Sequence, residues 1–138
     1  MTSSTVRRTV RISAYYDLIV TAGFALPFTA PALFEGFEAL QVTLGVPGSV
    51  PDSGDPFTVL FANLMGSLVV VWSVFRLARP SRAAGAADTA ARILFSLGMA
   101  AALVHGASPL VLAMLVLEVL WAIVQGAVVV SARRPVVV

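Results

Sequence analysis

A chain of 138 residues that is 59% hydrophobic and only 12% charged differs sharply from a soluble domain, in which about a quarter of the residues are charged. All nine basic residues are Arg and flank apolar runs, a pattern typical of membrane spans, so the net charge of +2 does not indicate a nucleic-acid partner. The absence of Cys excludes disulfides and Cys-ligated metals. We predict no cofactor and no metal site.

The first part of the chain is expected to be a basic cytoplasmic arm followed by a membrane span. Residues 1–11 form the arm, which we expect to be frayed, and the apolar residues 12–34 form the span. Pro27 and Pro31 are expected to kink or loosen its outer half. A cleaved signal peptide over residues 1–32 is the less favoured alternative, because the apolar run is too long for one.

The longest polar segment, residues 35–56, is predicted to be an outer loop. Phe37, Leu40 and Leu44 recur at helical spacing, so its first half either continues the first helix or forms a short helix in the membrane interface. Its second half is rich in Gly, Pro, Asp and Ser, which is typical of a loop.

Three further spans are predicted in the second half of the chain. Their expected bounds are residues 57–77, 90–105 and 109–131. The apolar run of the last one is roughly 33 Å long as a helix, about one bilayer core, and it has no polar face. The third span is rich in Ala and Gly, and we expect its helix to start at Asp88, because Asp is a good N-cap residue.

The distribution of charge predicts the topology. Four spans place all nine Arg residues on one side and Glu35, Glu38, Asp52 and Asp55 on the other. By the positive-inside rule, both termini are then cytoplasmic. We therefore predict an all-α integral membrane protein, a four-helix bundle over residues 12–138, in a bacterial-type cytoplasmic membrane.

Two charged residues inside the spans suggest a structural ion pair. Asp17 and Arg92 lie at the same expected depth near the cytoplasmic edge, and charged groups inside a bilayer usually face a bundle interior and pair. Alternatively, Arg92 extends its side chain to the interface or pairs with Asp88 four residues earlier.

A second polar group lies deeper in the membrane. Glu118 is near the middle of the fourth span, and Asn63 is at a matching depth in the second. Glu118, Trp121 and Gln125 share one helix face. Either a protonated Glu118 is hydrogen-bonded to Asn63 and holds two helices together, or these residues form a ligand- or proton-binding site in a small cavity.

Small residues four apart recur along the predicted spans and allow close helix packing. The pairs are Ala62/Gly66, Ser96/Ala100, Gly98/Ala102 and Ala122/Gly126. Packing within one chain is the simpler interpretation, and a homodimer face is the alternative.

The segment LFANLMGSLVVV, residues 60–71, with the Arg-rich turn and Ala-rich span that follow it, resembles the DoxX-like small membrane proteins. The resemblance implies a four-helix membrane bundle. It departs from the family at Asn63, where that family is expected to have a carboxylate, so no catalytic residue is carried over.

Three functional hypotheses follow. The leading one is an accessory membrane protein without assignable catalysis, which docks a partner or forms a homo-oligomer. The second is a small transporter or hydrophobic-ligand binder that uses Glu118. The third is a membrane enzyme acting on a lipid or quinone-like substrate, with Glu118 or Asp17 as the acid or base. The expected partners are the lipid bilayer, a larger complex or a small hydrophobic ligand.

Overall fold

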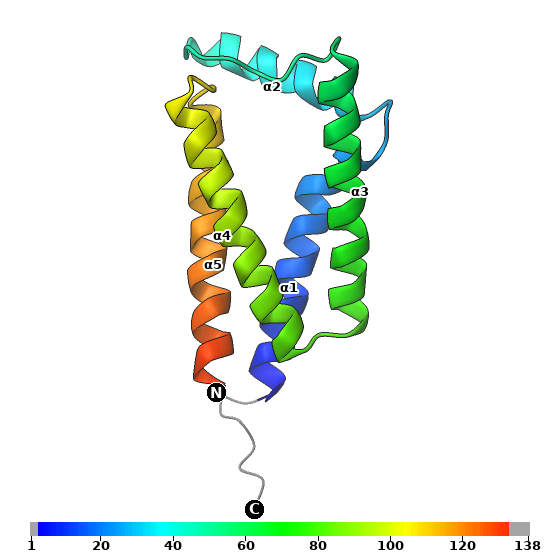
Figure 1. The fold of residues 1–138 in the computed structure, drawn as a ribbon, viewed down its shortest axis with the longest axis vertical. Coiled ribbons are helices and arrows are strands. Elements are labelled where there is room, and N and C mark those ends of the chain that lie inside the picture. Colours follow the sequence, from blue (N-terminus) through cyan, green and yellow to red (C-terminus); the bar gives the residue numbers. More distant parts are fainter. Residues whose placement is uncertain (1–2, 133–138) are drawn as a thin grey trace, which may run out of the picture.

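The structure is a computed structural model that describes residues 3–132. The helices are α1 (Ser3–Thr21), the short 3-10 helix η1 (Ala22–Ala25), α2 (Ala30–Leu44), α3 (Pro56–Ala78), α4 (Arg82–Val104) and α5 (Leu110–Ser131). The prediction of an all-helical chain is confirmed for these residues. Helices α1, α3, α4 and α5 run along the long axis of the molecule, and α2 lies across one end (Figure 1).

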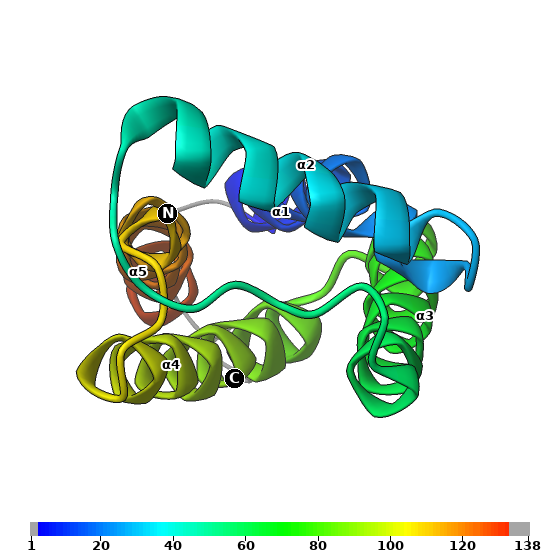
Figure 2. The ribbon, with the colours of Figure 1, turned by 90° about the horizontal axis from the view of Figure 1, so that it is seen from above.

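The four long helices pack in pairs. α4 packs along α5, α1 packs along α3, and α1 also contacts both α4 and α5. The two pairs diverge toward α2, which crosses above their ends (Figures 1 and 2). The start of α1, the α3–α4 connection and the end of α5 gather at the opposite end (Figure 1), which we call the arginine end.

The expected first span is broken. α1 ends at Thr21 and, after η1, the chain turns into α2 at an angle of 105°. Pro31 occupies the first turn of α2, where its missing N–H leaves no helical bond unmade. The loosening expected in the outer half of residues 12–34 is thus a full break between two helices, which together are long and apolar enough for one broken span. The helix past residue 35 is the separate α2 and does not continue α1.

The beginning of the chain is more ordered than expected. α1 starts at Ser3, and Val6 and Val10 are buried against Val128 and Ala132 of the last helix. Apolar packing thus extends the helix through residues 3–11, so the prediction of a frayed arm is wrong there. Residues 1–2 lie outside the described part of the chain.

The other helices agree with the predicted spans except at the start of α4. α3 and α5 lie within about two residues of the expected bounds, a difference within the uncertainty of any helix end. α4 begins at Arg82, and its N-cap is Ser81, whose Oγ accepts a hydrogen bond of 3.1 Å from Ala84 N. The Ala-rich sequence before residue 90 favours helix, so Asp88 lies inside α4 instead of capping it.

The loop after α2 is fastened to the α4–α5 turn. Ser49 N donates to Gly106 O at 2.9 Å, and Ser108 N donates to Ser49 O at 2.8 Å. Gly48 has a φ of 114°, and a Cβ there would lie 2.8 Å from the Ser108 backbone, so only Gly fits this approach. The loop therefore holds α2 across the end of α4 and α5.

The burial pattern is the reverse of that of a soluble protein. Leu68, Leu97 and Ile123 are exposed by 62%, 62% and 63%, whereas Arg76 and Arg92 are exposed by only 0% and 2%. Within residues 3–132, three helices, α3, α4 and α5, are long and apolar enough to cross a membrane, and the bent pair formed by α1–η1 and α2 makes up to four. Apolar surface of this extent on a helical chain indicates a lipid environment.

Candidate functional site

Five charged side chains from four helices meet in the interior and form what we call the ion cluster. They are Asp17 of α1, Arg76 of α3, Asp88 and Arg92 of α4, and Glu118 of α5, and five ion pairs join them. Four of the five residues are at least nine-tenths buried, and the Glu118 side chain is exposed by 13%. Each long helix therefore contributes a charge to one site.

Arg92 lies at the centre of the ion cluster. Its Nη2 is 2.7 Å from Asp17 Oδ1, its Nε is 3.1 Å from Asp88 Oδ2, and its Nη1 is 2.8 Å from Glu118 Oε2. The structure thus brings Asp17 and Arg92 together and also pairs Arg92 with Asp88. Its burial is incompatible with the alternative of a side chain that extends to the interface. One planar guanidinium, with five donors in fixed directions, joins three helices.

Arg76 is the member of the cluster that the sequence did not reveal. It pairs with Asp17 and, through Nη1 at 2.7 Å, with Asp88 Oδ2. In the sequence it stands with Arg79 at the end of an apolar run, where snorkelling explains both residues equally well. The two arginines differ in their position around the helix. Arg76 lies on the same inward face as Ser73, whose Oγ it contacts at 3.1 Å.

Neutral polar groups complete the shell around Asp88. Trp72 Nε1 donates to Asp88 Oδ1 at 2.9 Å, and Gln125 Nε2 donates to Asp88 Oδ2 at 2.9 Å. Ser13 Oγ donates to the same Oδ2 at 3.1 Å and accepts from both arginines. Asp88 is thus held by α1, α3, α4 and α5, which accounts for its burial without a capping role.

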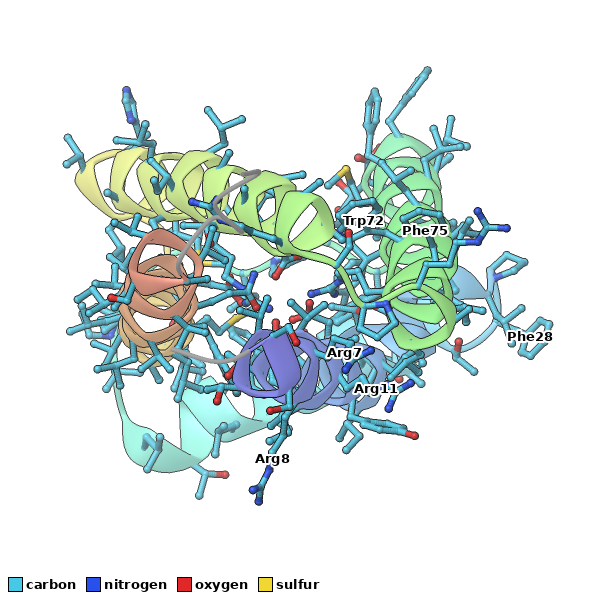
Figure 3. The ribbon with its side chains drawn as sticks, turned by 90° about the horizontal axis from the view of Figure 1, so that it is seen from below. Arg7, Arg8, Arg11, Phe28, Trp72 and Phe75 are labelled. Carbon is cyan, nitrogen blue, oxygen red and sulfur yellow. The ribbon has the colours of Figure 1, made fainter. Side chains whose placement is uncertain are left out.

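Aromatic rings cover both guanidinium groups. The Arg92 guanidinium lies 5.7 Å from the Tyr16 ring centre and 5.8 Å from that of Trp121. Arg76 lies 5.7 Å from the ring of Trp72, which is stacked on Phe75 (Figure 3). Cation–π contacts of this kind favour the charged state of arginine in a site that excludes water. Trp121 and Gln125, predicted to share a face with Glu118, therefore both face the ion cluster.

The predicted contact between Glu118 and Asn63 is wrong. Asn63 Nδ2 donates to Phe24 O at 2.8 Å, and Ser67 Oγ donates to Ala25 O at 3.3 Å. The break after α1 leaves carbonyl groups of η1 without helical donors, and inside lipid such groups need a partner. Asn63 thus supplies a hydrogen-bond donor to a carbonyl at the break, whereas Glu118 accepts a hydrogen bond from Arg92.

An apolar cavity of about 450 Å³ lies beneath α2, and we call it the chamber. Side chains of η1, α2, α4, α5 and the loop before α3 line it, among them Phe24, Phe34, Phe37, Met99, Val111 and Met114. Ser49 is the only polar side chain in its lining. Glu118 follows Met114 by four residues on the same face of α5, about 6 Å further along the helix axis. The lining of the chamber itself contains no residue of the ion cluster.

No family model, no curated protein and no solved structure matches this chain. The resemblance to the DoxX-like proteins stays a prediction. Function must accordingly be inferred from the site itself.

Proposed function

We propose that this chain is an integral membrane protein with four spans, formed by α1, α3, α4 and α5. The buried charges and the exposed apolar side chains support this placement. Five Arg residues at the arginine end are exposed, namely Arg7, Arg8, Arg11, Arg79 and Arg82, and Figure 3 shows the first three on α1, viewed from this end. The positive-inside rule makes it the cytoplasmic side. Arg133 and Arg134, predicted for the same side, lie outside the described residues.

Its function in this proposal is to bind a small hydrophobic molecule taken from the bilayer. The chamber is the observation that carries the proposal, because its volume of about 450 Å³ falls in the range of ligand pockets, and its apolar walls with a few polar groups nearby match their usual chemistry. The ion cluster supports it by holding the long helices at fixed positions, so that the space below α2 is built into the fold. This corresponds to the hydrophobic-ligand alternative from the sequence.

Retention of a copurifying molecule tests this function. The protein is purified in mild detergent, and bound lipids and small molecules are identified by native mass spectrometry. Ala102→Trp fills the chamber and is expected to reduce retention at least tenfold. Ala113→Trp on α5 is the matched control, because Ala113 is exposed and is not part of the chamber lining. Equal retention in the two variants would remove the chamber from the proposal.

Partner docking, the leading hypothesis from the sequence, has a separate observation in its favour. A hollow of about 490 Å³ lies between α4 and α5, and its lining includes the small residues Ser96, Ala100 and Ala122. Gly66 and Gly126, by contrast, closely approach neighbouring parts of this chain, so these two glycines serve internal packing. A second copy docked in the hollow predicts that Ser96→Cys forms a disulfide-linked dimer in membranes, whereas Leu94→Cys, whose side chain is exposed, does not.

A further inference from the structure

The ion cluster is not electrically balanced. Its three carboxylates, on Asp17, Asp88 and Glu118, exceed its two guanidinium groups by one negative charge. Among residues 3–132, the one further titratable side chain in contact with it is the Tyr16 phenol, whose ring lies beside Arg92. An uncompensated charge between helices in a bilayer is costly, and such charges are usually paired. The cluster therefore needs one more positive charge.

The hydrogen-bond network carries a second sign that it is incomplete. Gln125 is fully buried, and its Oε1 has no donor within the described part of the chain, although Nε2 of the same amide is bonded to Asp88. Buried acceptors without a donor are rare in folded proteins. A donor is also missing its partner, because Nε of Arg76 has no acceptor. The charge excess therefore marks the cluster as one that binds a proton, and the two unpaired atoms show that its hydrogen bonding is also incomplete around Asp88.

From these observations, we infer that the ion cluster binds one exchangeable proton and that Glu118 carries it. Asp17 and Asp88 each pair with both arginines, whereas Glu118 pairs with Arg92 alone, through Oε2. Among the described residues, its Oε1 has no partner. Protonation at Oε1 forms one O–H bond while an O–H bond of a hydronium ion breaks and releases water, and no atom changes its oxidation state. The neutral carboxyl still accepts a hydrogen bond from Arg92 at Oε2. Becoming neutral therefore costs Glu118 fewer ion pairs than it would cost Asp17 or Asp88.

Exposure and pairing together favour exchange at Glu118. The Glu118 and Asp17 side chains are exposed by 13% and 11%, and that of Asp88 by 4%. Of the two more exposed carboxylates, Glu118 is the one that pairs with a single arginine. The proton can therefore leave and return without separating Asp17 or Asp88 from the arginines. The inference rests on the proposed bilayer placement of the helices and is independent of any ligand in the chamber.

Infrared spectroscopy of the protein reconstituted in lipid vesicles tests the assignment. A neutral carboxyl has a C=O stretch separate from that of a carboxylate, and the stretch shifts in heavy water. The wild type is expected to show this band at pH 7 and to lose it reversibly as the pH is raised. Glu118→Gln should remove it entirely, and Glu35→Gln, at the opposite end of the molecule, should leave it unchanged.

Two results would overturn the inference. If the wild type shows no neutral carboxyl at pH 7, the cluster keeps its negative charge and binds no proton. If the band survives Glu118→Gln but disappears in Asp88→Asn, the proton is on Asp88, where the Gln125 carbonyl would accept it. Should Glu118→Gln fail to fold, the wild-type titration and heavy-water shift still decide whether a proton is bound. Equal retention by Ala102→Trp and Ala113→Trp would count against the proposed function alone and leave the proton assignment standing.

Discussion

Arg92 is the residue on which the ion cluster depends most, because its guanidinium contacts carboxylates on α1, α4 and α5. Removing one partner from a buried ionic group leaves the others uncompensated, which costs more than the group contributes when paired. Asp17 and Asp88 retain Arg76 in that case, but Glu118 retains no cation. Loss of Arg92 is therefore expected to affect Glu118 more than the two aspartates.

Replacing Arg92 is expected to destabilise the fold severely. Arg92→Gln should lower the free energy of unfolding by about 3–5 kcal/mol, the usual cost of breaking a buried ion pair. Arg79→Gln removes an exposed Arg from the end of α3 and should stay within about 0.5 kcal/mol. Unfolding in mixed micelles with increasing SDS measures both. Similar values for the two variants would mean that the buried charges do not hold the helices together.

The contact between Asp17 and Arg92 predicts non-additivity. Asp17→Asn and Arg92→Gln should each destabilise the protein, and the double variant should cost less than the sum by about 0.5–3 kcal/mol. Stability of the two single variants and the double variant in one detergent completes the cycle. A coupling energy of zero would show that the 2.7 Å contact contributes nothing to stability.

The depth of a residue along its span could be read from the sequence, but which helices are adjacent, and which faces they present to each other, could not. Expected depth correctly suggested that Asp17 and Arg92 meet. It gave Glu118 the wrong partner, because the Asn63 amide bonds to η1 and Glu118 bonds to Arg92. Which helices adjoin, and at what rotation, depends on packing between segments far apart in the chain. Arg76 was missed for the same reason.

At the scale of the secondary-structure elements, the fold depends on how α3 meets the broken end of α1. A Cβ at Gly66 would lie 2.5 Å from the Phe24 carbonyl carbon and 2.6 Å from Ala25 N. Both are backbone atoms and cannot move aside, so α3 approaches η1 closely only with Gly at this position. Asn63 and Ser67, on the same side of α3, bond to η1 carbonyls.

Two glycine substitutions are expected to have opposite effects. Gly66→Ala should destabilise the protein by about 1–3 kcal/mol, because the added methyl forces α3 away from η1. Gly98→Ala has nothing within 4 Å of its new Cβ and should stabilise α4 by about 0.5–1 kcal/mol through helix propensity. Thermal unfolding in one detergent compares them. Stabilisation by both would show that the close contact at Gly66 is absent.

The N-cap of α3 predicts a dependence of stability on pH. Asp55 Oδ2 accepts hydrogen bonds from Thr58 Oγ1 at 2.6 Å and from Thr58 N at 2.9 Å, and these bonds lower the pKa of Asp55 below its ordinary value of 3.8. The stabilisation is thus fully present above pH 3.8 and is lost as the pH falls through the lower folded pKa. The wild type should be more stable than Asp55→Ala at pH 6, and this difference should shrink below pH 3.8.

Thr58→Val provides the matched comparison for the cap. It removes the side-chain hydrogen bond, the largest cause of the lowered pKa, and keeps the bond from Thr58 N. The dependence of stability on acid should therefore be weaker in this variant than in the wild type. If stability depends on pH in this variant as it does in the wild type, the dependence arises from other carboxylates.

The bounds of α3 and α5 could be predicted from apolar run length and breaker residues, whereas those of α1 and the start of α4 could not. The break near Pro27 was expected only as a kink, because the sequence does not show whether the carbonyls released by a break will find donors. Asn63 and Ser67 supply them from 39 and 42 residues further along the chain. Such long-range compensation decides between a kink and a full turn.

For the whole molecule, the proposed topology predicts a labelling pattern. The chain has no Cys, so single cysteines can be placed at Ser53, Ser81 and Ser131 and probed in intact cells with an impermeant thiol reagent. Ser53→Cys, in the loop before α3, should react from outside. Ser81→Cys and Ser131→Cys, at the arginine end, should react only after lysis. Reaction of Ser81→Cys in intact cells would reverse or abolish the proposed four-span topology.

The ion cluster also has a consequence for biosynthesis. Arg76 and Arg92 follow Asp17 by 59 and 75 residues, a delay of roughly 3–15 s at ordinary rates of translation. Meanwhile α1, which is not among the three helices apolar enough to cross a membrane alone, carries a carboxylate without its counter-ions. Stable insertion of α1 must therefore await the later helices. A nascent chain released before α4 is complete would leave its first helix uninserted and open to quality-control proteases.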